Sequence, residues 1–292
     1  MVRQLIACAC SLMSFLLTAV AVGQHELTIA IEPRVVTARR FDPVVFRVVL
    51  HNQSKTHIHA TQKPTASSGI LKMEIRRKGN ADYRRILTTT ENLGWGARVG
   101  TNVEFLPGGK RTTGVVLAET SYVKMFDGSG TYELRAVVTD SKEFSGVSEP
   151  IEIQVEDISS AQSNAAETAA NLIALETLGG LSIGATEKAF LEATRPLNEC
   201  GLKRVIRLLA AIAAIREANT RDGFETARKR LEEMRIGLSE PTQDWVSLTL
   251  GQTLYKMEQI ELAAEEARRI PTAIASNLTH YFQRLEKDKG LA

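Results

Sequence analysis

Apolar side chains recur at every second position in the first half of this chain and at every third or fourth position in the second half. A period of two is typical of strands with one buried face, and a period near 3.6 is typical of helices. The change falls at a polar, small-residue segment, residues 159–164. We therefore expect an α+β multidomain protein with an antiparallel β-sandwich first and an all-α helical-hairpin domain second. The expected limits are residues 24–157 for the sandwich, 158–168 for a linker and helix start, and 169–292 for the helical domain.

Short alternating segments separated by turn residues make up the predicted sandwich. Leu27, Ile29 and Ile31 alternate with mostly polar neighbours, and Pro33 ends that strand. Seven or so such strands, bounded by Gly, Pro and Asn, predict two packed antiparallel sheets. The other expected strands are residues 44–50, 70–76, 103–106, 115–117, 130–138 and 151–155.

Four local patterns within this region form a family resemblance. They are Asn-x-Ser after a strand at 52–54, Leu-Pro-Gly at 106–108, Gly-x-Tyr-x-Leu-x-Ala at 130–136, and a final Ser-x-Pro strand opening at 148–153. Together they resemble bacterial immunoglobulin-like domains of exported proteins. The resemblance implies an immunoglobulin-like sandwich, and within it Tyr132 resembles the tyrosine whose hydroxyl braces a loop near a late strand. Such sandwiches host many activities, so the resemblance implies no particular one.

The helical half is predicted from caps, breakers and periodic apolar residues. Asn164, Thr186 and Asp222 are the expected N-caps. Residues 202–218 are strongly apolar and predict a central, mostly buried helix, and residues 245–269 predict one long helix. Pro196, Pro241 and Pro271 are the expected helix boundaries.

Two of the expected helical hairpins resemble tetratricopeptide units. Ala227 is followed 36 residues later by Ala263, and Gly251 precedes Ala263 by 12 residues. The usual period is 34 residues, and most signature positions of the repeat are missing. A repeat superhelix and a plain helical bundle therefore both stay open.

The N-terminus has the pattern of a signal peptide at residues 1–23. Arg3 precedes an almost wholly apolar or small run, residues 5–22, and small residues at Ala21 and Gly23 offer cleavage sites. We expect export to the periplasm or the extracellular space, with no membrane span left after cleavage. An uncleaved N-terminal anchor helix is the alternative. Cleavage would leave Cys200 as the single cysteine, which excludes an internal disulfide.

Charge argues against a nucleic-acid partner. The chain carries 36 Lys and Arg against 34 Asp and Glu, a formal net charge of +2. The balance is similar on both sides of Asp157, so neither half has the basic excess that binding a phosphate backbone requires.

Histidines provide the candidate metal ligands. His57 and His59 are two residues apart, so on one strand both imidazoles would share a face, and His51 lies nearby in sequence. Paired imidazoles can hold zinc or copper. His25 would become the first residue if cleavage followed Gln24, and a terminal histidine on an immunoglobulin-like fold resembles copper monooxygenases that attack polysaccharides. The competing interpretation of this group is an ordinary solvated strand end.

The remaining candidates are a thiol and two tryptophans. Cys200 has no nearby base and is expected to be a partly buried, inert thiol. Trp95 lies in a glycine-flanked loop and is a candidate anchor for carbohydrate or peptide, or a plug for the end of the sandwich. Trp245 begins a helix and is expected to pack. No serine-hydrolase, phosphate-loop, dinucleotide-binding or metalloprotease motif occurs in the sequence.

These observations predict a non-enzymatic exported protein without a cofactor, which binds another envelope or extracellular protein or a glycan. One alternative is a metal-binding protein or copper-dependent enzyme that uses His25, His57 and His59. Another is a purely structural envelope component. The ligand and the oligomeric state stay open.

Overall fold

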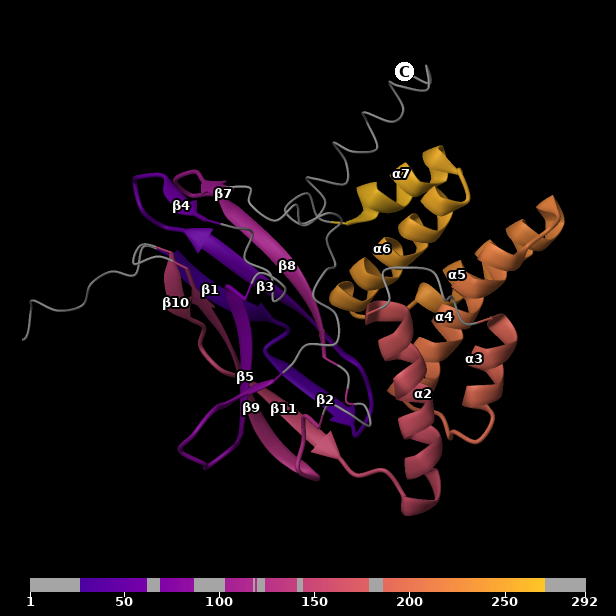
Figure 1. Cartoon of the computed structure of the whole chain (residues 1–292), viewed down its shortest axis with the longest axis horizontal. Helices are drawn as coiled ribbons and strands as arrows, with labels where there is room; N and C mark the ends of the chain where they lie inside the picture. The colour runs from indigo at the N-terminus through magenta and orange to yellow at the C-terminus, as the bar shows by residue number, and fades with distance from the viewer. Residues whose placement is uncertain are drawn as a thin grey trace, which may run out of the picture.

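The computed structural model describes residues 27–61, 69–86, 103–117, 119, 124–140, 144–178 and 186–270. Within these ranges, strands occupy the chain up to Glu156 and helices follow from Ser160 (Figure 1). The α+β class predicted from the two periods is confirmed. The predicted signal peptide, His25 and Trp95 lie outside the described residues.

Each strand expected from alternation is present, with its ends moved by a few residues. The sequence did not reveal β2, β4, β6 and β10, three of which are only three residues long and so too short to show a period. The bounds are β1 (Leu27–Glu32), β2 (Val35–Arg39), β3 (Val44–Asn52), β4 (Ile58–Ala60), β5 (Leu71–Arg77), β6 (Arg84–Ile86), β7 (Val103–Phe105), β8 (Lys110–Leu117), β9 (Gly130–Thr139), β10 (Ser145–Val147) and β11 (Ile151–Glu156).

The strands form two larger sheets and one small pair. One sheet has the order β1-β3-β8, the other has the order β2-β11-β9-β5-β6 with β10 beside β9, and β4 pairs with β7. The prediction of a purely antiparallel arrangement is wrong at one edge, because β2 pairs with β11 in parallel, with Val36 opposite Ile153. The chain leaves the first sheet after Glu32 and joins the second within three residues, so β2 is added beside the last strand rather than beside its own neighbour in sequence.

Both larger sheets contribute alternate residues to a single apolar core. Leu27, Ile29 and Ile31 are buried as expected, and so are Phe46 on β3 and Leu134 on β9. Burying one large aliphatic or aromatic side chain contributes roughly 1.5–3 kcal/mol. The shared core therefore holds the two sheets together.

Tyr132 braces the loop that precedes its own strand. Its hydroxyl donates to the carbonyl of Gly128 at 2.8 Å and accepts from the backbone N–H of Asp127 at 3.1 Å. Its ring is buried, and it packs edge-on against Phe126 with the ring centroids 5.0 Å apart. The structural role predicted for Tyr132 is confirmed.

The helices gather at one end of the sheets (Figure 1). Consecutive helices contact one another in the pairs α3 with α4, α4 with α5, and α6 with α7. The apolar run that predicted a central helix forms α4, which buries ten of its residues. The bounds are α2 (Ser160–Leu178), α3 (Glu187–Thr194), α4 (Gly201–Glu217), α5 (Arg221–Arg235), α6 (Glu240–Lys256) and α7 (Ile260–Arg269).

Helix ends were only partly predictable. Thr186 caps α3 as expected, by accepting from the N–H of Ala189. Thr220 rather than Asp222 caps α5, because Asp222 already lies in the first turn, where its charge suits the helix dipole. The helix expected to open at Asn164 begins four residues earlier, at Ser160.

Two further helix boundaries differ from the prediction. Pro241 lies inside the first turn of α6, where a missing N–H costs no helical hydrogen bond, and not in a loop before it. The long helix expected over residues 245–269 is broken between Lys256 and Ile260, where Glu258 has φ of 61°. The break lets α7 fold back against α6.

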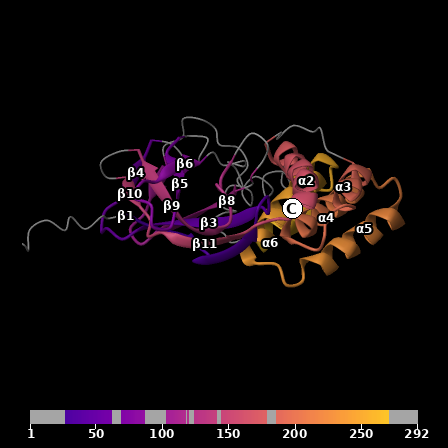
Figure 2. The same ribbon diagram turned by 90° about the horizontal axis from the view of Figure 1, so that it is seen from below.

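The strand and helix parts lie side by side along the long axis of the molecule (Figure 2). Phe41, Val45 and Val116 come from the strand part but belong to the apolar cluster of the helices. This shared cluster fixes how the two parts face each other. We call the contact region between the strand part and the helices the joint.

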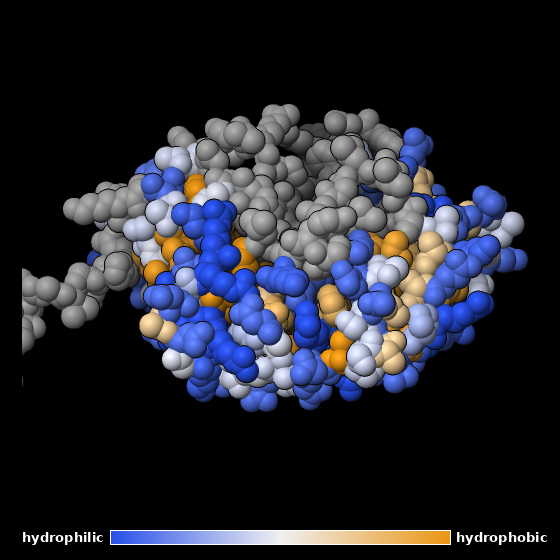
Figure 3. Space-filling model, turned by 60° about the horizontal axis from the view of Figure 1, so that its bottom comes forward, coloured by the Kyte–Doolittle hydropathy of each residue, from blue (hydrophilic) through white to orange (hydrophobic). Residues whose placement is uncertain are grey.

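None of the described helices has the length and apolar character needed to cross a membrane. Seen from below, the surface is mainly hydrophilic, and apolar side chains show in separate patches (Figure 3).

Candidate pocket at the joint

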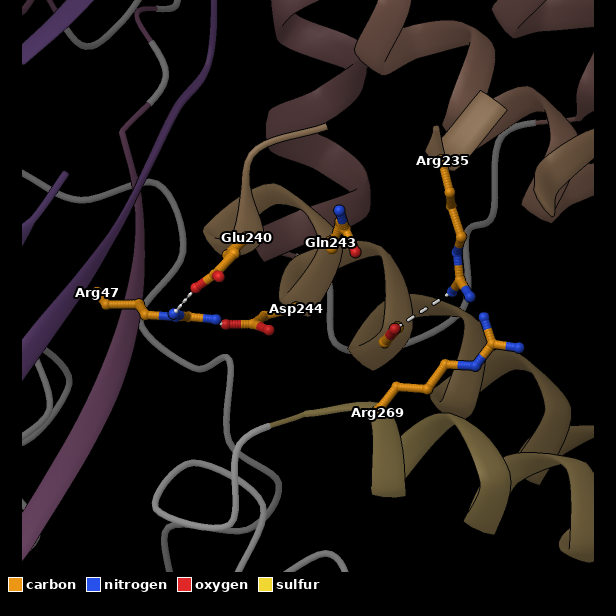
Figure 4. A pocket seen from close by; sticks show the side chains of 7 residues that line it. Arg47, Arg235, Glu240, Gln243, Asp244 and Arg269 are labelled. Carbon is orange, nitrogen blue, oxygen red and sulfur yellow. Dashed lines mark hydrogen bonds and ion pairs between the residues drawn. The ribbon is translucent and has the colours of Figure 1, made fainter. Parts of the chain in front are cut away.

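A pocket of about 530 Å³ opens at the joint. Volumes between roughly 300 and 1,000 Å³ are typical of sites for small molecules. Its lining is polar and charged: Arg47 comes from β3, Arg235 ends α5, Arg269 ends α7, and Glu240, Gln243, Asp244 and Ser247 come from α6 (Figure 4).

The α6 residues reach the pocket together because of their spacing. Positions 240, 243, 244 and 247 follow the i, i+3, i+4, i+7 pattern that places side chains on one face of a helix. Trp245, Val246 and Leu248 lie on other faces of α6 and are buried in the apolar core, which anchors the helix. The burial expected for Trp245 is confirmed.

At one end of the pocket, Arg47 bridges two carboxylates. Its Nε donates to Asp244 Oδ2 at 2.7 Å, and its Nη1 donates to Glu240 Oε2 at 2.6 Å. The Asp244 side chain is 6% exposed, whereas that of Glu240 is 77% exposed. This end of the pocket therefore has two carboxylates and one guanidinium.

Burial and the nearby guanidinium shift the pKa of Asp244 in opposite directions. Burial raises the pKa of Asp244, the Arg47 guanidinium lowers it, and the neighbouring Glu240 adds a smaller upward push. The hydrogen bond to Asp244 is the largest cause that raises the pKa of Arg47. We take the guanidinium as charged, because arginine keeps its proton in proteins. The shift that bears on the pocket is therefore the raised pKa of Asp244, which burial causes.

At the other end, Arg235 is almost fully buried and heavily paired. Its Nη2 donates to Glu266 Oε2 at 2.6 Å and to Ser247 Oγ at 3.3 Å, and its Nη1 donates to Glu232 Oε1 at 3.1 Å. Its Nε is buried and has no hydrogen-bond partner among the described residues.

Arg269 completes this end of the pocket. Its Nη1 donates to both carboxylate oxygens of Glu232, at 3.1 and 3.0 Å, and its side chain is 46% exposed. Figure 4 shows the guanidinium groups of Arg235 and Arg269 close to each other. Two arginines and the glutamates Glu232 and Glu266 thus balance in charge, but the buried Nε–H of Arg235 has no partner in the part of the chain that the structure describes.

A second polar contact fastens the joint away from the pocket. Asp42 lies in the strand part, and its Oδ1 accepts from the N–H of Leu202 in the first turn of α4 at 2.7 Å, while Oδ2 accepts from the N–H of Arg39 at 3.0 Å. Gly201 leaves room for this carboxylate, because a Cβ there would lie 2.9 Å from Asp42 Oδ2. Burial is the largest influence on the pKa of Asp42 and raises it, against the backbone hydrogen bonds.

Cys200 is the N-cap of α4, where its sulfur accepts from the N–H of Lys203 at 3.5 Å. Burial is the main cause of the raised pKa of its thiol, and Asp42 adds a smaller upward push. A thiol with a raised pKa is mostly protonated and therefore a poor nucleophile at neutral pH.

Only His57 and His59 of the predicted histidine site fall within the described residues, so the site as a whole stays a prediction. His59 is exposed on β4, and His57, which is half exposed, pairs through Nδ1 with Glu104 Oε1 at 2.5 Å. The hydrogen bond from His57 lowers the pKa of Glu104. No group of three or more potential metal ligands occurs in the part of the chain that the structure describes. His25 and Trp95 lie outside it.

Sequence reasoning missed the pocket residues altogether. The sequence feature that could have pointed to the pocket is Arg47, a single charged residue inside the apolar strand 44–50. Its partner Asp244 is 197 residues away along the chain, so no local pattern pairs the two.

The fold and site define an α+β protein with a polar pocket at the joint between strands and helices. No protein-family model matches the sequence, and no curated protein matches it. One solved structure with some similarity is a Pseudomonas fluorescens alkylpurine DNA glycosylase, AlkC, bound to DNA containing an abasic-site analogue. The TM-score is 0.27 at 10% sequence identity, over 48% of this chain and 33% of that one. The match thus spans about a third of the glycosylase.

This comparison contradicts several predictions from the sequence. No family model supports membership of the bacterial exported immunoglobulin-like proteins with a tetratricopeptide-like domain, and the structural match found is to a DNA-bound enzyme, so that family assignment is corrected. The predictions of a non-enzymatic envelope protein, of an envelope or glycan partner and of no nucleic-acid partner are corrected with it. Likeness at this TM-score assigns neither a fold nor an activity, so nothing below rests on the glycosylase.

Proposed function

We propose that the chain binds a small polar molecule in the pocket at the joint, and that this molecule presents a hydrogen-bond acceptor to Arg235. The observation that carries the proposal is the unpaired Nε–H of Arg235, a 7% exposed residue in the pocket wall. A buried donor without a partner costs about 1–3 kcal/mol, and more when the group is charged. The Nε–H itself has almost no accessible surface, so a ligand oxygen recovers that free energy once a small movement of the Arg235 side chain turns this group toward the pocket.

The surrounding structure suits a preformed site. Arg47 and Asp244 tie β3 to α6, and Glu232 and Glu266 hold the guanidinium of Arg235 in place. Groups that are already oriented lose little conformational entropy when a ligand binds.

Ligand-dependent thermal unfolding tests the proposal. The probes are inorganic phosphate, small mono- and dicarboxylates, and small zwitterions. A ligand at 100 times its dissociation constant stabilises the folded state by about 2.7 kcal/mol, which raises the melting temperature by several degrees. We expect at least one probe to do so.

Gln243→Trp is the blocking variant, because Gln243 lines the pocket and is exposed on α6. Gln252→Trp is the matched control, nine residues further along the same helix and therefore on its opposite side. The probe should stabilise the control and leave the blocking variant unchanged. If no probe shifts the wild-type protein, or if Gln243→Trp responds like the control, the proposal is wrong.

We also propose that the strand part has the immunoglobulin-like topology and that the chain divides near Asp157. The support is the sheet pair β1-β3-β8 and β2-β11-β9-β5-β6, the braced Tyr132, and the change from strand to helix between Glu156 and Ser160. Nuclear Overhauser contacts between Val36 and Ile153 would test the parallel edge. Their absence would contradict this topology.

Export remains a proposal that rests on residues 1–23, with Arg3, the apolar run and small residues at Ala21 and Gly23 as its support. N-terminal sequencing of the protein from its native host tests it. A start just after Ala21 or Gly23 is expected, and an intact Met1 would contradict cleavage.

A further inference from the structure

We infer that the ligand of the pocket is a small zwitterion with its two charges several ångströms apart, of the kind formed by the two termini of a di- or tripeptide. Its ammonium group lies beside Glu240 and Asp244, and its carboxylate lies beside Arg235 and Arg269. This inference rests on the proposed function and adds the chemical class of the ligand.

The Arg47 end of the pocket favours a cation. Two carboxylates, Glu240 and Asp244, share the single guanidinium of Arg47, which leaves one negative charge in excess. Only one oxygen of each carboxylate bonds to Arg47, so among the described residues the second oxygen of each is open to another donor. A ligand ammonium has three N–H donors and a positive charge, and it meets both needs.

The Arg235 end favours an anion. Its two arginines are balanced by Glu232 and Glu266, so a ligand carboxylate is not drawn there by net charge alone. It is drawn mainly by Arg269, which is 46% exposed and whose hydrogen bonds to described residues come from Nη1, with Nε 3.7 Å from Glu266 Oε1. The Nε–H of Arg235 adds a second donor once its side chain moves toward the pocket. Hydrogen bonds from a guanidinium to a carboxylate are about twice as strong as those between neutral groups.

A ligand with only one charge suits the pocket less well. Counting the partners of the lining arginines, three guanidinium groups face four carboxylates, which disfavours a simple anion. A simple cation leaves the Nε–H of Arg235 without an acceptor. A molecule with both charges satisfies both ends without displacing an existing ion pair.

The helix sets the required separation of the charges. Asp244 and Ser247, which touches Arg235, are three residues apart on α6, and Glu240 and Ser247 are seven apart. At 1.5 Å per residue, these pairs span about 4.5 and 10 Å along the helix axis. An extended dipeptide spans about 7 Å and a tripeptide about 10 Å. A single α-amino acid is too short to reach both ends.

Calorimetric titration of the full chain at pH 7 tests the inference, with glycylglycine and triglycine as probes. N-acetylglycylglycine lacks the ammonium group, and glycylglycinamide lacks the carboxylate. We expect at least one of the two peptides to bind, and each blocked analogue to bind at least ten times more weakly than the tighter-binding peptide. Equal binding of a blocked analogue and the free peptide overturns the inference.

Single variants test which end of the pocket binds the ammonium group and which binds the carboxylate of the peptide. Glu240→Gln should weaken peptide binding, whereas Glu261→Gln, an exposed glutamate in the first turn of α7, should not. Arg269→Gln should weaken binding, whereas the exposed Arg221→Gln should not. Glu240 and Arg269 are themselves partly exposed, so these changes should leave the fold intact. If both pocket variants bind peptide like their controls, the assignment is wrong.

Different results would disprove the proposed ligand pocket and the inferred zwitterionic ligand. If phosphate or a simple acid binds and Gln243→Trp abolishes that binding, while the peptides do not bind, the pocket is a ligand site but the zwitterion inference is wrong. If none of the probes binds, both are wrong.

Discussion

Replacing Asp42 by alanine tests whether the strand and helix parts stabilise each other through the joint. The Asp42 carboxylate accepts from the N–H of Leu202 at 2.7 Å and from the N–H of Arg39 at 3.0 Å, and the residue is 9% exposed. The alanine variant leaves both donors without this acceptor. The Leu202 N–H is buried, so its loss of an acceptor costs about 1–3 kcal/mol, whereas the partly buried N–H of Arg39 adds less, for a gross loss of roughly 1–4 kcal/mol.

Part of that loss is offset. The raised pKa of Asp42 means that burial disfavours its charged form, and alanine removes this cost. We therefore expect Asp42→Ala to lower the free energy of unfolding by about 1–3 kcal/mol. Asp42→Asn keeps one oxygen acceptor and should lose about half as much.

Urea unfolding followed by circular dichroism at 222 nm measures both variants. The helical signal should fall in a single transition that shifts to lower urea in the variants, because the parts share an apolar cluster as well as this carboxylate. An Asp42→Ala protein within about 0.5 kcal/mol of the wild type, which is the usual range for a surface substitution, would show that the carboxylate does not stabilise the joint.

The pH dependence gives an independent check. A carboxyl group whose pKa is raised by folding binds its proton more tightly in the folded state. Its stabilising contribution is therefore complete below the ordinary aspartate pKa and is lost as the pH rises through the raised value. The difference in stability between the wild type and Asp42→Asn should shrink as the pH rises through this window. A difference that grows with pH would contradict the raised pKa of Asp42.

Three more predictions concern single residues. Tyr132→Phe removes the hydroxyl that bonds to Gly128 and Asp127 and should cost about 1–3 kcal/mol in urea unfolding, whereas an unchanged midpoint would mean that the loop does not need the brace. Cys200 should react with iodoacetamide at pH 8 more slowly than free cysteine, because burial raises the pKa of its thiol, and an equal or faster rate would contradict that assignment. Peptide affinity should fall as the pH is lowered through the raised pKa of Asp244, because protonation removes the charge that holds the ammonium group, and calorimetry across this range should show no such fall in Asp244→Asn.

The local sequence was sufficient for the class of fold and for much of the core. The alternation of Leu27, Ile29 and Ile31 predicted which side chains are buried, because in a strand the direction of a side chain depends only on its position. The apolar run at 202–218 likewise predicted the buried helix α4. Thr186 was recognisable as a cap because capping involves residues only three positions apart.

Features that depend on contacts between segments far apart in the chain could not be predicted from the sequence. The parallel pairing of β2 with β11 joins Val36 to Ile153, and nothing near either residue specifies the other. The break between Lys256 and Ile260 likewise serves a distant contact, because it lets α7 pack back on α6, with Gly251 in ordinary contact with the Ala263 carbonyl.

The candidate pocket belongs wholly to the features that depend on contacts between distant segments. His57 and His59 are candidate ligands because they are close in sequence; both are exposed in the structure, and His25 lies outside the described residues. Arg47 and Asp244 meet across 197 residues, and Arg235 meets Glu266 only because α5, α6 and α7 pack around one core. Periodicity by itself determined what each segment becomes, since hydrophobic burial acts on one face of a strand or helix. Only the tertiary structure decided which charges share the pocket, because ion pairs form between whichever side chains packing brings within a few ångströms.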